Sequence, residues 1–186
     1  FHNGNALPPN PALVTFDDGY RDNYEFAFPI LKKRSIPAVI FLATDYINQC
    51  KPFYWDVAAY CFQHSQQKSA NLPFLGQRTW SDAGTRGIVL KDWLTNLKQI
   101  PDTKKQEAIT RLPGILNVTP PNDCTANHCL SWDQVRAMLN DGIEFGSHSQ
   151  SHPIMTQIPL PQAYNEIAGA KIKIEEETGR TVQSFA

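Results

Sequence analysis

The sequence lacks the features that mark several broad classes of protein. None of its apolar runs approaches the roughly 18 to 20 residues that a transmembrane helix needs, and it has neither an internal repeat nor a low-complexity tract. Its formal net charge is only -1 and its pI is about 6.6, so no excess of positive charge favours nucleic acid or a membrane surface. With 186 residues, 41% of them apolar and 19% charged, the chain suits one globular domain with a sizeable core.

A signal peptide is also missing, but the chain begins with Phe1 rather than Met. We therefore expect the N-terminus to be cut, which leaves room for an export signal and for a location in the cell envelope or outside the cell. Residues 1–11 are rich in Asn, Gly and Pro and predict a loop that enters the first strand, with His2 exposed in it.

Two adjacent carboxylates end the first apolar run. Residues 13–16 read Leu-Val-Thr-Phe, as in a buried strand, and Asp17, Asp18 and Gly19 follow directly. Such a turn would hold both acids at the carboxyl end of the strand. Because Asp and Gly are common turn residues, a turn without chemistry is the alternative.

Two histidines end a second apolar run in the same way. Residues 143–145 lead into a loop that contains His148 and His152, and Pro153 follows. This spacing can bring both imidazoles to one side of a helical turn, and a polar loop without ligands is the alternative. One carboxylate and two neutral imidazoles would make a facial triad, which leaves coordination positions open for water and substrate.

The two motifs resemble those of a known family. The sequence TFDDG at 15–19 is similar to the first motif of the polysaccharide deacetylases, the NodB-like carbohydrate esterases of family 4, and HSQSH at 148–152 is similar to their second. The resemblance extends to the flanking residues 18–24, 29–33, 36–42 and 130–135. The stretch from about 50 to 129 resembles no part of the family. Both motifs in this order are specific, whereas neither alone would be.

The resemblance implies a role for each site residue. Asp17 would be the catalytic base, and Asp18, His148 and His152 would bind a divalent metal ion, Zn before Co, Ni or Fe. The expected enzyme is a metal-dependent hydrolase that removes acetyl groups from N-acetylated sugars of a polysaccharide or oligosaccharide. A metal-activated water would attack the acetyl group and Asp17 would take the proton. No substrate-binding residue is implied.

Two other functions stay open. A catalytically inactive carbohydrate-binding module would keep the NodB-like fold, and its affinity for sugar would depend neither on metal nor on Asp17. A hydrolase of another acetamide or ester substrate would keep the same triad.

The family fold is a deformed (β/α) barrel, and the periodicity of this chain agrees with an α/β protein. Apolar residues at helical spacing over 24–31 stand between the first strand and the continuous apolar run 38–43, which predicts a strand, a helix and a parallel strand. Pro29 should kink this helix or lie in its first turn. Residues 50–130 predict a largely helical insertion, with helices over 53–62, 89–100 and 103–112. The aromatic residues of 53–62 are expected to be core, with a sugar-stacking wall as the alternative.

Four cysteines lie in or beside that insertion: Cys50, Cys61, Cys124 and Cys129. Disulfides would suit an exported protein, and buried thiols are an equal alternative. The last two cysteines with His128 between them could bind zinc, but their spacing does not match the usual Cys-x2-Cys pair. For His64 and His128 we favour surface or core roles over chemistry.

The C-terminal part predicts further elements of an α/β fold. Ser131 and Gln134 resemble a capping box, and a helix over 161–178 should be amphipathic through Tyr164, Ile167, Ala168, Lys171, Ile172 and Glu175 and end at Gly179. Residues 181–186 start another strand. The family's third motif and the histidine that acts as its general acid do not lie in these residues. We therefore expect an incomplete barrel, truncated at both ends, that binds metal with weak or absent turnover and self-associates through unpaired strand edges.

Overall fold

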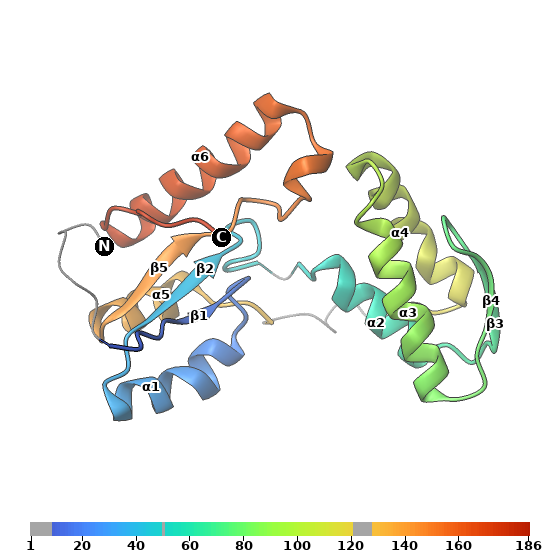
Figure 1. Cartoon of the computed structure of the whole chain (residues 1–186), viewed down its shortest axis with the longest axis horizontal. Coiled ribbons are helices and arrows are strands. Elements are labelled where there is room, and N and C mark those ends of the chain that lie inside the picture. Colours follow the sequence, from blue (N-terminus) through green and yellow to red (C-terminus); the bar gives the residue numbers. More distant parts are fainter. Residues whose placement is uncertain (1–8, 50, 121–127) are drawn as a thin grey trace.

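The sheet that carries both motifs has three parallel strands. The computed structural model describes residues 9–49, 51–120 and 128–186. The strands are β1 (Val14–Phe16), β2 (Ala38–Leu42) and β5 (Ile143–Ser147), in the order β1-β2-β5. All three run in the same direction, so their carboxyl ends lie at one edge of the sheet (Figure 1). The central strand β2 is apolar throughout and almost entirely buried, as expected for a strand with neighbours on both sides.

The first crossover follows the predicted order of strand, helix and strand. A π-helical turn, η1 (Asn23–Ala27), continues into α1 (Phe28–Arg34) and leads to β2. Pro29 lies in the first turn of α1, where its missing N–H costs no hydrogen bond, which is one of the two positions predicted for it. Three basic residues occupy the last turn of α1, where their positive charge interacts favourably with the negative end of the helix dipole.

Three helices pack around the sheet in one part of the molecule (Figure 1). Besides α1 these are α5 (Trp132–Asn140) and α6 (Leu160–Thr178), with a short 3-10 turn, η2 (Met155–Gln157), before α6. Their apolar side chains and those of the strands form one core, to which α5 contributes Val135 and Met138 and α6 contributes Ile174. We call these elements, with β1, β2 and β5, the sheet body.

The chain between β2 and β5 forms a second body with a core of its own. Residues 54–118, which we call the helical body, contain α2 (Tyr54–His64), β3 (Ser69–Leu72), β4 (Gly76–Thr79), α3 (Ala83–Leu97) and α4 (Asp102–Leu116). The strands β3 and β4 are an antiparallel hairpin. Trp93, Leu97, Leu112 and Leu116 are completely buried in this second core. Figure 1 shows the helical body beside the sheet body rather than against its sheet.

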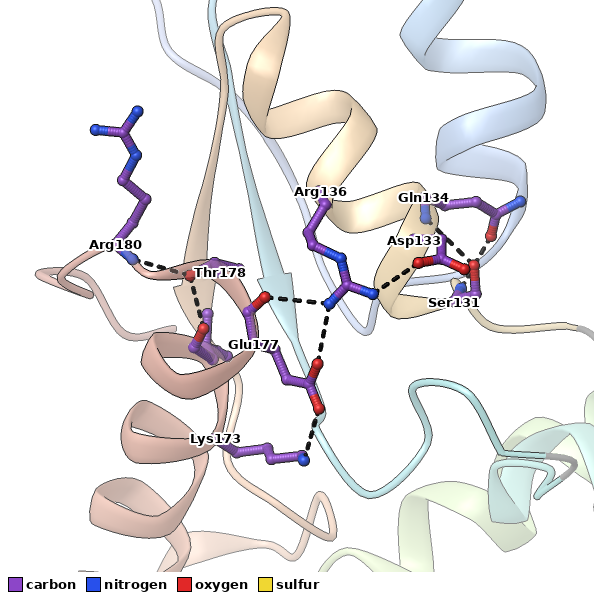
Figure 2. A network of polar contacts seen from close by, with 9 residues as sticks. Ser131, Asp133, Gln134, Arg136, Lys173, Glu177, Thr178 and Arg180 are labelled. Atoms are coloured by element: carbon purple, nitrogen blue, oxygen red, sulfur yellow. Dashed lines mark hydrogen bonds and ion pairs between the residues drawn. The ribbon is translucent and has the colours of Figure 1, made fainter.

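The helices of the sheet body are also linked by exposed ion pairs. Figure 2 shows the Arg136 guanidinium between Asp133, at 2.7 Å, and Glu177 of α6, at 3.0 Å. Lys173 donates to the same Glu177 carboxylate over 2.8 Å. Such exposed pairs contribute about 0 to 1 kcal/mol each, so this network orients α5 and α6 more than it stabilises the fold. The predicted capping box of α5 is confirmed, with the Ser131 and Gln134 side chains each bonded to the other's backbone N–H.

The expected α/β class with a parallel sheet is confirmed, but a closed barrel is not seen. In the described part of the chain the sheet is open, and residues 181–186 add only one isolated parallel bridge, between Phe185 and Ser147. The three helices predicted between 50 and 130 are present as α2, α3 and α4, and α3 starts at Ala83 rather than Val89. None of the described helices combines the length and apolar character needed to cross a membrane.

The buried face of α6 differs from the predicted one. The helix ends at Gly179 as predicted, with a φ of 65°, but Tyr164, Ile167 and Ile172 are 71%, 40% and 54% exposed. The buried positions are instead Glu166, Ala170 and Ile174. The prediction chose the face of the helix that has the larger apolar residues. The other face is buried because the small Ala170 allows close packing on the sheet body and because Glu166 accepts hydrogen bonds from residues of the sheet body.

Candidate metal centre

The turn after β1 separates the two aspartates. Asp18 and Gly19 both have left-handed backbone conformations, with φ of 71° and 77°, and the Gly19 N–H donates to the Asp17 carbonyl over 2.9 Å. A Cβ on Gly19 would lie 2.8 Å from side-chain atoms of Leu42 and Ile47, so both the conformation and the space require glycine. The turn leaves Asp17 exposed and carries Asp18 inward, where its side chain is 18% exposed.

The loop after β5 carries the two histidines. The His148 N–H donates to the Leu42 carbonyl over 2.9 Å and so extends the pairing of β5 with β2. The rest of the loop is not the helical turn that the spacing allowed, because Ser149 and His152 have left-handed φ of 63° and 57°. These conformations cost free energy in residues other than glycine, so the contacts around the loop must hold it in place.

Three side-chain atoms from the two loops converge. Asp18 Oδ1 lies 3.4 Å from His148 Nε2 and 3.2 Å from His152 Nε2, and the three possible ligand atoms all lie within 4.8 Å of one another. Two ligands bound to zinc at about 2.1 Å and a tetrahedral angle lie about 3.4 Å apart. In the described part of the chain no hydrogen-bond donor reaches the buried Asp18 Oδ1. The set of donors and their spacing therefore fit a single divalent cation.

A main-chain contact orients one of the imidazoles. His148 Nδ1 lies 2.7 Å from the main-chain oxygen of Ala186. Because that oxygen can only accept, Nδ1 carries the proton in the neutral ring and Nε2 keeps its lone pair for a cation. Histidines that bind metals usually have such a partner on their second nitrogen. His152 Nδ1, in contrast, is buried with no partner among the described residues.

Aromatic side chains at the start of α2 and just before it lie beside His152. The Trp55 ring meets the His152 ring edge-on at 4.9 Å between centroids, and Phe53 does so at 5.8 Å. Phe53 is stacked between Trp55, at 4.5 Å, and Tyr46, at 3.9 Å. The expectation that these aromatics are core holds for Phe53, which is 1% exposed, but Trp55 is only partly buried.

A short polar chain runs from Trp55 to Asp56. Trp55 Nε1 donates to the Tyr20 hydroxyl over 2.6 Å, and that hydroxyl donates to Asp56 Oδ2 over 3.0 Å. Burial raises the pKa of both Tyr20 and Asp56, and the Asp18 charge raises each further. Asp56 is therefore a partly buried carboxylate in the electrostatic field of the metal-ligand candidates.

The predicted site residues divide into two groups. Asp18, His148 and His152 come together, whereas Asp17 lies next to them at the strand end with an exposed side chain. Sequence reasoning missed Tyr20, Asp56 and, in α6, Glu166. The available signal for Glu166 was its position on the same helical stripe as Ala170 and Ile174, because a carboxylate there needs a buried partner.

The cysteine predictions are tested only in part. Cys129 and Cys61 are buried in different cores and are not bonded to each other, and burial raises the pKa of the Cys129 thiol to about 12. Cys50, Cys124 and His2 lie outside the described residues. His64 is exposed and stacks on Tyr60, and neither it nor the exposed His128 joins a ligand cluster among the described residues.

The fold and the cluster together define an α/β protein with a candidate metal centre at the carboxyl edge of a parallel sheet. The sequence profile of the polysaccharide deacetylase family matches residues 4–186. The chain therefore belongs to the polysaccharide deacetylase family, which confirms the resemblance carried by its two motifs.

The chain is also similar to individual proteins. The putative polysaccharide deacetylase YxkH of Bacillus subtilis is 60% identical over 30 residues, which are 16% of this chain and 11% of that protein. The structure of the Streptococcus pyogenes deacetylase PplD, solved in complex with acetate, is similar over 98% of this chain and 48% of that one, with a TM-score of 0.54 and 15% identity. The chain thus spans about half the length of that solved relative.

Proposed function

We propose that this chain provides the metal centre of a hydrolase that removes acetyl groups from N-acetylated sugars of a polysaccharide. The observation that supports the proposal most is the convergence of Asp18 Oδ1 with the Nε2 atoms of His148 and His152, within 4.8 Å, in a member of a family of polysaccharide deacetylases. The same proposal makes the N-acetylated polymer or oligomer the partner of the chain.

The three converging residues would hold the cation. Two imidazoles and one carboxylate suit zinc, with cobalt, nickel or iron as alternatives, and three protein ligands leave room for water and substrate. A bound divalent cation would supply the positive charge that polarises an acetyl carbonyl and acidifies water. Asp18 would balance part of that charge, and the contact of His148 Nδ1 with the main-chain oxygen of Ala186 orients the imidazole ring.

Asp17 is the proposed base. Its side chain is exposed at the end of β1, next to the ligand Asp18, and the backbone turn at Asp18 and Gly19 keeps the two carboxylates in different environments. A carboxylate that is not needed as a ligand can accept the proton of the attacking water. This division of labour assigns ligand binding to Asp18 and proton transfer to Asp17.

Titration with Zn²⁺ and Co²⁺ by calorimetry tests the centre. We expect one saturable site in the wild-type chain and an unchanged site in Asp17→Asn, because Asp17 is not a ligand. If the wild-type chain shows no saturable binding, or if Asp17→Asn binds the metal much more weakly, the assignment of the two aspartates is wrong.

Acetate release and binding of an N-acetylglucosamine oligomer separate the enzyme from a binding module. The proposal requires that any acetate release stops with Asp17→Asn or with removal of the metal, and that oligomer affinity falls when the metal is removed. Oligomer affinity that depends neither on metal nor on Asp17, without acetate release, would identify the carbohydrate-binding module instead. Acetate release that survives both changes contradicts the mechanism.

The remaining parts of the proposal concern the fold and the setting. We propose that the open sheet belongs to a deformed (β/α) barrel, with residues 50–130 as an insertion, which is supported by the family match and by the parallel bridge of Phe185 to Ser147. A polymeric substrate favours a location in the cell envelope or outside the cell, which fractionation would test.

A further inference from the structure

The loop that carries both histidines depends on a residue outside the two motifs. Glu166, in the second turn of α6, is 7% exposed and points at this loop. Its Oε2 atom accepts the N–H groups of Gln150 and Ser151, each over 2.8 Å, and its Oε1 atom accepts the Ser151 hydroxyl over 2.6 Å. All three bonds are short and lie within ordinary hydrogen-bond distances.

The backbone carbonyls of the loop are bonded to a different segment from its amides. On the other side of the loop, the carbonyls of Ser149 and Gln150 accept the N–H groups of Thr44 and Asp45, over 3.2 and 3.0 Å. The Ser151 carbonyl accepts the Tyr46 hydroxyl over 3.3 Å. The segment after β2 therefore holds the loop's carbonyls.

The amides of the same loop divide differently. His148 donates to the backbone of β2, and His152 donates to the Ser149 hydroxyl over 3.2 Å. The amides of Gln150 and Ser151 find their acceptor in the single Oε2 atom of Glu166. Buried amides without an acceptor cost free energy, so removing this oxygen would push the loop toward a conformation that hydrates them.

This arrangement matters because the loop is held in a costly conformation. Ser149 and His152 lie on either side of the two bonded amides and both have left-handed backbone conformations. Glu166 therefore stabilises a loop geometry in which His148 Nε2 and His152 Nε2 both face Asp18 Oδ1. Gly169, one turn further along α6, leaves the space that the Gln150 side chain occupies, so the helix accommodates the loop at two points.

We propose that Glu166 is a positioning residue of the metal centre: it holds the 148–152 loop, through two amides and one hydroxyl, in the geometry that binds the cation. The inference rests on the proposed function for the identity of the ligands. It adds that the affinity of the site depends on the reach and acceptor capacity of the side chain at position 166, and much less on its charge.

Three substitutions at this position separate these properties. Glu166→Leu removes every acceptor and should weaken Co²⁺ and Zn²⁺ binding by about 10- to 100-fold, the usual cost of losing a group that orients metal ligands. Glu166→Asp keeps the charge but is one methylene too short for all three bonds, and should weaken binding by about 10-fold. Glu166→Gln keeps the reach, can accept both amides and donate to Ser151, and should stay within about threefold of wild type.

The measurements are calorimetric metal titration, the visible spectrum of the Co²⁺ form, and hydrogen exchange of the amides in 148–152, all well below the melting temperature. Faster exchange of Gln150 and Ser151 should accompany the weaker binding. Glu176→Leu, at an exposed position of the same helix, is the matched control and should bind metal as the wild type does.

Each outcome bears on one proposal. Absence of metal binding in the wild-type chain overturns the proposed function, whereas wild-type affinity in Glu166→Leu overturns this inference alone. If Glu166→Leu does not fold, the other two variants test the inference. Glu166→Asp that binds metal like the wild type, or Glu166→Gln that binds it more weakly than Glu166→Asp, would show that the charge at position 166 matters more than its reach. Either result overturns the inference.

Discussion

The sheet body and the helical body differ in the partner that each gives to a largely buried carboxylate. In the sheet body, Asp18 Oδ1 faces two imidazoles and has no hydrogen-bond partner among the described residues. In the helical body, Asp102 Oδ1 forms an ion pair with the buried Lys105 ammonium. A cation between Asp18 and the two imidazoles would supply the positive charge that Lys105 supplies to Asp102.

The candidate site lies almost entirely in the sheet body, so most of the helical body contributes to stability and not to the site. The helical body has its own apolar core, and none of the three candidate ligands lies in it. Among the described residues, it contacts the site through the start of α2, where Trp55 lies against His152 and Asp56 is bonded to Tyr20. Substitutions in the two bodies should therefore affect different quantities, except at that junction.

The largest expected effect is the loss of the metal site on substitution of a ligand. Asp18→Ala removes the only carboxylate of the trio, so we expect no saturable Zn²⁺ binding by calorimetry, and the same result for His148→Ala and His152→Ala. Because Asp18 is already partly unsatisfied, the fold should tolerate its removal, with an unchanged circular dichroism spectrum. Full metal occupancy in Asp18→Ala would break the assignment of function to the sheet body.

A core substitution in the helical body should show the opposite pattern. Leu112 is completely buried in α4, and Leu112→Ala should lower the free energy of unfolding by about 3 kcal/mol while metal affinity stays the same. Urea denaturation and metal titration of the same sample check both. Ile88→Ala, at a position 60% exposed on α3, should change stability by less than about 0.5 kcal/mol. Metal affinity that falls together with stability would show that the bodies are not separable.

The junction should give an intermediate effect. Trp55→Ala removes the ring beside His152 and the N–H that binds the Tyr20 hydroxyl, so we expect metal affinity to fall by about 10-fold, as for other groups that support a ligand. Trp55→Phe keeps the ring and should lose less. Phe74→Ala, half-exposed between β3 and β4, serves as the control in metal titrations. If the metal affinity of Trp55→Ala equals that of the wild type, the helical body does not support the site through Trp55.

The smallest expected effect is a dependence of stability on pH through Asp56. Burial, with the Asp18 charge, raises its folded pKa, while Tyr20 and the charge of His128 act in the opposite direction. A raised pKa means that the folded state favours the protonated carboxyl group of Asp56. The stability cost of ionising Asp56 is therefore complete above the folded-state pKa, and it disappears as the pH falls below the unfolded-state pKa. Asp56→Asn keeps an acceptor for Tyr20 and removes this cost.

Melting temperatures between about pH 3 and pH 8 measure this dependence. The advantage of Asp56→Asn over wild type should be largest at neutral pH and should shrink as the pH falls. An advantage that grows toward acid pH would contradict the raised pKa of Asp56.

Much of the site was predictable because its parts are local patterns. An apolar run that stops at Asp17-Asp18-Gly19, and another that stops before His148, each describe a strand and the loop after it. The helices α2 and α4 followed from periodicity, and α5 followed from periodicity and its capping box. The buried face of α6 did not, because periodicity finds an apolar stripe but not the surface on which the helix packs.

The sequence by itself thus determined where the strands end and which carboxylates and imidazoles follow them. It could do so because strands, turns and helix caps depend on neighbours within a few positions. Only the packing of distant segments decided that Asp18 Oδ1 would lie 3.2 and 3.4 Å from two imidazoles some 130 residues away. The same packing set Glu166 under the histidine loop and Trp55 beside His152. These contacts join elements far apart in the chain, and the free energy that selects them comes from burying shared surface and pairing buried polar groups.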